Sequence, residues 1–143
     1  FIKNLLASAK AKRPAAYNAE MNGFTVNYDR WYVDLLSFEK MRGDNWEWTT
    51  DFYDSSQNDF TISGMEDIQA VFCDIHENNR FDEPGIHKAY EVCELLVILR
   101  LQELFSAVYK DSFHAWTEIP MFVMAHDYDF IYSPNFKDRA PVQ

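Results

Sequence analysis

Cysteine is scarce in this sequence of 143 residues, which limits the classes of protein it can belong to. The chain has two cysteines, Cys73 and Cys93, and they do not form a C-x-x-C pair. Two isolated cysteines cannot build a disulfide scaffold and are too few for a four-cysteine zinc site. We expect both to be reduced thiols in the core of a cytoplasmic protein.

Glycine is also scarce, with four residues, and no G-x-G-x-x-G, Walker A or G-x-S-x-G motif occurs. Glycine-rich turns of these kinds bring the backbone close to a phosphate or expose a nucleophilic serine. We therefore expect no cofactor, and no motif identifies a reaction. Because active sites can be assembled from separate elements, an enzyme is the alternative rather than the first hypothesis.

Long apolar runs are missing as well. Runs such as residues 95–99 are far shorter than the roughly 18 residues that a membrane-spanning helix needs. We expect no association with a membrane.

Lysine and arginine are absent from residues 43–79, which carry nine acidic residues. Residues 1–42 hold seven basic and four acidic residues (+3), residues 43–83 hold one and eleven (−10), and residues 84–143 hold five and eight (−3). A surface with this charge repels nucleic acid and attracts basic proteins. We expect a basic protein partner and no nucleic acid partner, while the oligomeric state is left open.

Apolar and aromatic residues are plentiful, at 48% and 17%, which is enough for a hydrophobic core. The length is typical of one domain. We expect a single domain over residues 1–143, with an N-terminal helix over residues 1–13 and a tail over residues 134–143.

Turn residues and hydrophobic alternation predict the strands. We expect a loop over residues 15–23 and a strand over residues 24–29. Residues 29–41 fit helical spacing almost as well as a strand, and we favour a strand because Trp, Tyr and Val prefer a pleated surface. The remaining expected strands cover residues 46–54, with Trp46, Trp48, Thr50 and Phe52 on one face, and residues 60–63. One or two further strands are expected over residues 119–134.

Helical spacing predicts two further helices. Ser63 and Glu66 have the spacing of a capping box, which would open a helix with Met65, Ile68, Val71 or Phe72, and Ile75 on its apolar side. Asp82 is expected to cap a longer helix over about 84–110, covered on more than one flank because residues 95–99 are apolar all round. These elements predict an α+β fold, a mainly antiparallel sheet packed against two to three helices, including this long central helix.

The candidate functional residues lie in the acidic, aromatic stretch from residue 43 to residue 60. Protein interfaces take much of their energy from Trp, Tyr and Arg, and acidic side chains would pair with a basic partner. The first hypothesis is a small acidic protein without enzymatic activity that masks a basic partner, analogous in size and charge to immunity proteins and inhibitors of nuclease toxins. Its expected partner-binding residues are Asp44, Glu47, Asp51, Tyr53, Asp54 and Asp59.

The sequence H-D-Y-D at residues 126–129 supplies the alternative hypothesis, a hydrolase or metal-binding enzyme. In a strand, Asp127 and Asp129 would project from the same face and could share a cation with His126. A turn explains the two aspartates as well, because Asp is a favoured turn residue. The sequence thus predicts no metal site as its first choice and His126, Asp127 and Asp129 as the alternative.

Overall fold

The computed structural model describes residues 14–24, 26–41, 46–56, 60–111, 119–128 and 132–133. The N-terminal helix expected over residues 1–13 and the tail expected over residues 134–143 lie outside the described residues.

A mixed sheet of five strands forms the centre of the fold. Its strands are β1 (Ala16–Asn22), β2 (Tyr32–Phe38), β3 (Asp54–Ser55), β4 (Phe60–Thr61) and β5 (Met121–Ala125). The order is β3-β2-β1-β5, with β4 also paired to β2. Three of the pairs are antiparallel, and β1 pairs with β5 in parallel. Together with two helices this confirms the α+β class.

β1 lies inside the sheet, between β2 and β5, so the loop predicted over residues 15–23 is wrong. Six of its seven residues are buried. Alanine and asparagine, which are frequent in this segment, have low intrinsic strand preference. The strand forms because its two neighbours pair with its backbone groups, which the segment's own composition does not reveal.

The strand predicted over residues 24–29 is wrong, because this segment is a turn. The backbone N–H groups of Val26 and Asn27 both donate to the carbonyl of Gly23, at 3.0 and 3.2 Å. Phe24 has a positive φ of 54° and places its ring 5.0 Å from that of Trp31. The strand favoured within residues 29–41 is confirmed as β2, and β4 covers the first half of the short strand expected over residues 60–63.

The strand predicted over residues 46–54 is wrong. The chain forms a short 3-10 helix, η1 (Trp46–Thr50), and only then the two-residue strand β3. A 3-10 helix has about three residues per turn, so the expected two-residue alternation does not apply. Trp48 is buried at 5% exposure while Phe52, expected on the same face, is 48% exposed.

The helix predicted from the capping box is present as α2 (Glu66–Glu77), but the box itself is not formed. The N-cap is Met65, with no side-chain capping bond. The Glu66 carboxylate accepts a hydrogen bond from the N–H of Gly64 at 3.0 Å. Phe72 faces the core and Val71 is 56% exposed, which decides between the two residues that the spacing left open.

The long helix is confirmed as α3 (Ile86–Asp111), 26 residues in length. Asp82 is not its N-cap, because the helix begins at Ile86 after a turn at Pro84 and Gly85. The expectation that residues 95–99 are covered on more than one flank is wrong: Leu95, Leu96 and Leu99 are 50–57% exposed. Within the described part, no helix is long and apolar enough to cross a membrane.

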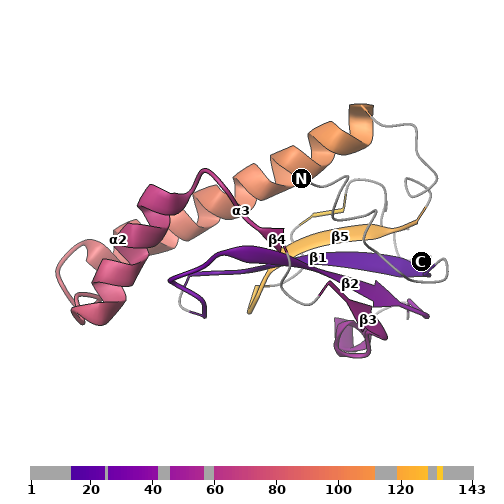
Figure 1. The fold of residues 1–143 in the computed structure, drawn as a ribbon, viewed down its shortest axis with the longest axis horizontal. Coiled ribbons are helices and arrows are strands. Elements are labelled where there is room, and N and C mark those ends of the chain that lie inside the picture. The colour runs from indigo at the N-terminus through magenta and orange to yellow at the C-terminus, as the bar shows by residue number, and fades with distance from the viewer. Residues whose placement is uncertain are drawn as a thin grey trace, which may run out of the picture.

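α3 runs over one face of the sheet, α2 lies at the end of the sheet on the same side, and η1 lies beneath the other face (Figure 1). The main core forms between the helices and the side chains of Ala19, Met21, Val33, Leu35, Met121 and Val123. A smaller cluster forms on the opposite face from Ala16, Leu36, Phe38, Trp48 and Phe122. Both free cysteines are half-buried on the helices, with Cys93 packed against the main core.

Candidate partner-binding site

The smaller hydrophobic cluster anchors the segment that carries the predicted partner-binding residues. The buried Trp48 ring packs edge-on against Phe38 and Phe122, with centroids 4.7 and 5.6 Å apart. Just beyond it, the N–H of Asp51 donates to the Trp48 carbonyl at 3.1 Å, and the N–H of Tyr53 donates to Ser37 at 3.0 Å. The chain is thus fixed at both ends of a three-residue stretch.

Within that stretch Asp51, Phe52 and Tyr53 are all exposed. Phe52 and Tyr53 have exposed fractions of 48% and 41%. Phenylalanine and tyrosine normally bury most of their surface, and exposed aromatic rings are typical of protein interfaces. The fold therefore holds two aromatic rings and a carboxylate at the surface, on a backbone that hydrogen bonds fix at both ends.

A shallow hollow of about 130 Å³ lies at this stretch. Its lining combines the two residues that follow β2 with η1 and the residues after η1: Glu39, Lys40, Trp48, Asp51, Phe52 and Tyr53. Its lining includes two acidic residues, Glu39 and Asp51, and one basic residue, Lys40, and therefore has a net negative charge. The volume of the hollow is that of about one side chain.

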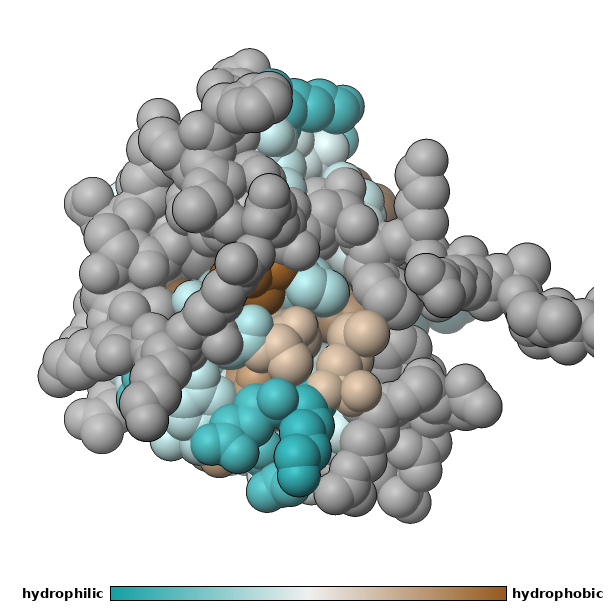
Figure 2. Space-filling model, turned by 90° about the vertical axis from the view of Figure 1, so that its right-hand side faces the viewer, coloured by the Kyte–Doolittle hydropathy of each residue, from teal (hydrophilic) through white to brown (hydrophobic). Residues whose placement is uncertain are grey.

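The negative charge around the hollow also affects the pKa of Tyr53. Partial burial raises the pKa of its phenol above the ordinary value, and the charges of Asp54 and Glu39 raise it further. Figure 2 looks onto the end of the molecule that lies on the right in Figure 1, where strongly hydrophilic residues border exposed hydrophobic ones. We call Glu39, Asp51, Phe52, Tyr53 and Asp54 the acidic aromatic patch.

The structure brings together three of the six residues predicted for partner binding, namely Asp51, Tyr53 and Asp54. Asp44 and Asp59 lie outside the described residues, and the side chain of Glu47 is not described. Glu39 and Phe52 are not among the six predicted residues. Glu39 directly follows β2, and the sequence gives no reason to place it beside residue 51. Phe52 was expected on the same face as Trp46 and Trp48 of a strand that does not form.

No protein-family model, curated protein or solved structure matches this chain. The functional assignment therefore depends on the geometry of the chain itself.

The alternative site at His126, Asp127 and Asp129 is only partly described, since Asp129 lies outside the described residues. β5 ends at Ala125, so the strand that would have aligned the two aspartates does not extend to them. His126 and Asp127 lie in a turn, where Asp127 has a φ of 64°. The described part of the chain contains no group of three His, Cys, Asp or Glu side chains that could hold a metal ion.

His126 instead contacts Glu20 of β1, and the contact is an ion pair when the imidazole is protonated. Its Nδ1 lies 2.8 Å from Oε1 of Glu20, and its Nε2 lies 3.7 Å from Oδ1 of Asp127. The hydrogen bond to Glu20 raises the pKa of His126, with the charges of Glu20 and Asp127 acting in the same direction and partial burial opposing them. The pair links the turn after β5 to the neighbouring parallel strand.

A buried carboxylate that the sequence did not single out lies on α3. Glu94 is 8% exposed and accepts a hydrogen bond from the hydroxyl of Tyr128 at 2.6 Å. Burial raises the pKa of Glu94, and the bond from Tyr128 only partly opposes that effect. The helical spacing could have located it, because Glu94 occupies the core side of α3 between Tyr90 and Val97.

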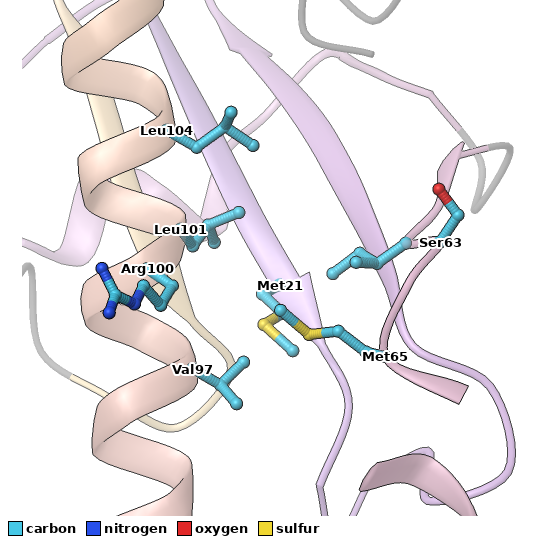
Figure 3. A pocket seen from close by; sticks show the side chains of 8 residues that line it. Met21, Ser63, Met65, Val97, Arg100, Leu101 and Leu104 are labelled. Carbon is cyan, nitrogen blue, oxygen red and sulfur yellow. The ribbon is translucent and has the colours of Figure 1, made fainter. Parts of the chain in front are cut away.

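An apolar pocket of about 310 Å³ lies between α3 and the segment that joins β4 to α2 (Figure 3). Val97, Leu101 and Leu104 point across it toward Met21 and Met65. The Arg100 guanidinium extends away from it and binds Glu103 at 2.6 Å. The walls of this pocket are mostly hydrophobic, and Ser63 and Arg100 are the polar residues in its lining.

Proposed function

We propose that this chain is a protein-binding module without enzymatic activity, which recognises a basic segment of a partner through the acidic aromatic patch. The observation that carries the proposal is the pair of exposed rings, Phe52 and Tyr53, held beside Asp51 and Glu39 over a hollow the size of one side chain. A lysine or arginine of the partner would enter the hollow, where carboxylates and rings both favour a cation.

The charge distribution supports a basic partner in particular. The negative charge is concentrated in residues 43–83, the part of the sequence that contributes Asp51, Tyr53 and Asp54. A concentrated field of one sign steers an oppositely charged partner and accelerates association by one to three orders of magnitude. Masking of the partner would follow from occlusion of its basic surface, with no chemical step.

The proposal is tested by affinity capture from a lysate of the source cell at about 50 and about 500 mM salt, with the retained proteins identified by mass spectrometry. The chain is used in three forms: wild type, Asp51→Asn/Asp54→Asn, and Asp67→Asn/Asp82→Asn. The third form removes the same charge from exposed acids outside the patch.

We expect the wild type and the Asp67→Asn/Asp82→Asn control to retain the same basic protein at low salt. The Asp51→Asn/Asp54→Asn variant should lose it. Equal losses in the two variants would show that total charge, and not the patch, determines binding. If no basic protein is retained at either salt concentration, the proposal is wrong.

Once a partner is identified, the rings provide a separate test. Truncating a well-packed aromatic anchor typically weakens an interface by more than about 1 kcal/mol. We expect Phe52→Ala and Tyr53→Ala each to raise the dissociation constant about fivefold or more, without changing the stability of the free chain. Unchanged affinity in both variants would exclude the rings from the interface.

A further inference from the structure

The outer face of α3 carries an apolar stripe that nothing in the described structure covers. Its members are Val92, Leu95, Leu96 and Leu99, with exposed fractions between 50% and 57%. With about 3.6 residues per turn, these four side chains lie along one side of the helix, opposite the core-facing Tyr90, Val97 and Leu101. We call them the α3 stripe.

The charges beside the α3 stripe are balanced, in contrast to the rest of the protein. The exposed charged residues from position 88 to position 103 are Lys88, Glu91, Arg100 and Glu103, two basic and two acidic. The charge of −10 for the whole chain would oppose self-association through most of its surface. The balanced charges on this helix face do not add to that repulsion.

The residues along the α3 stripe are arranged symmetrically about its midpoint, so two antiparallel copies of the helix would place complementary residues opposite each other. Val92 and Leu99 lie at equal distances on either side of the midpoint between Leu95 and Leu96, and so do Lys88 and Glu103. In two antiparallel helices related by a two-fold axis at that midpoint, each residue faces the one at the mirrored position. Val92 would face Leu99, and Lys88 would face Glu103, of the second copy.

We propose that the α3 stripe is a homodimer interface, in which α3 packs antiparallel against α3 of a second copy of this chain. The four apolar residues form the centre of the seam, and Leu95 and Leu96 of both copies surround the two-fold axis. The Lys88–Glu103 pair occurs twice, once at each end of the seam, and specifies the register. This surface is separate from the acidic aromatic patch, and the inference does not depend on the proposed function.

The test is sedimentation equilibrium of the full 143-residue chain over a concentration range of about 1–200 µM, because dimer formation depends on protomer concentration. We expect a monomer–dimer equilibrium for the wild type. Leu96→Glu should raise the dissociation constant at least about 100-fold, because it places two buried carboxylates beside the axis. Val26→Glu is the matched control, since Val26 is 46% exposed in the turn after β1, and it should dimerise like the wild type.

Charge reversal tests the register. Lys88→Glu and Glu103→Lys should each raise the dissociation constant on the order of tenfold, because each replaces two attractive pairs with repulsive ones. The double variant Lys88→Glu/Glu103→Lys should restore dimerisation toward the wild-type value. Circular dichroism establishes that each variant keeps its helical content.

Three results would overturn the proposal. A wild-type chain that is monomeric over the whole range would mean that the α3 stripe is covered by a different molecule or segment. A dimer that Leu96→Glu leaves intact would place the interface elsewhere. A double charge reversal that fails to restore dimerisation would exclude the antiparallel register.

Discussion

Phe72 is expected to contribute far more to stability than its neighbour Val71, although both fit the helical spacing of α2. Phe72 is 2% exposed, and its ring lies 5.1 Å from Trp31, 5.8 Å from Phe24 and 4.2 Å from Tyr90. Val71, about 100° away around the helix, is 56% exposed. The two residues together therefore test the rotational position of α2 against the sheet.

The magnitude follows from burial and ring contacts. Phe72→Ala removes a buried ring and leaves a cavity between α2, α3 and the segment before β2, a change that typically costs about 3–5 kcal/mol. Phe72→Leu keeps most of the apolar volume and loses the aromatic contacts, so we expect a cost of about 1–2 kcal/mol. Val71→Ala should change stability by less than about 0.5 kcal/mol, because the site is exposed and alanine favours a helix.

Urea denaturation followed by circular dichroism measures all three variants. For a domain of this length, each kcal/mol corresponds to about 3 °C in Tm, so thermal melts give an independent reading. We expect Phe72→Ala to lower Tm by roughly 10–15 °C and Val71→Ala to leave it nearly unchanged. The placement of α2 would be refuted if Val71→Ala cost as much as Phe72→Leu, or if Phe72→Ala cost less than about 1 kcal/mol.

Three more substitutions test other buried or paired groups by urea denaturation. Burial raises the pKa of Glu94, so ionisation of its carboxyl group destabilises the fold as pH rises. Glu94→Gln should therefore be more stable than the wild type at about pH 7 and equal to it near pH 4, where the carboxyl group is largely protonated in both the folded and the unfolded chain. A gain in stability that is the same at both pH values would contradict this. Glu20 raises the pKa of His126, so the contribution of this pair to stability is present below the ordinary pKa of histidine and is lost as pH rises through the raised value. His126→Ala should therefore cost more stability near pH 5.5 than near pH 9. A cost that does not depend on pH would exclude the charged pair. Gly23→Ala would place a methyl group 3.0 Å from the buried Trp31 ring and should cost about 1–3 kcal/mol, whereas a neutral result would mean that the ring can move.

The sequence alone predicted the elements whose signal is local. α2 and α3 follow from helical spacing over 12 and 26 residues, and β2 follows from a run of strand-forming side chains. The acidic stretch that contains Asp51 and Asp54 is also visible in the sequence, since charge requires no folding to be counted. These features establish the fold class and direct attention to one end of the sheet.

Tertiary structure decided the rest, because the deciding contacts join residues far apart in the chain. β1 becomes a strand only because β2 and β5 pair with both of its edges, although its composition favours a loop. Trp48 is buried and Phe52 exposed because η1 packs against Phe38 and Phe122 from two other strands. Glu39 and Asp51 line the same hollow for the same reason. The outward position of Leu95, Leu96 and Leu99 depends on which face of α3 the sheet covers. Side-chain periodicity specifies how residues are grouped around a helix or strand, but only packing determines which group faces the core.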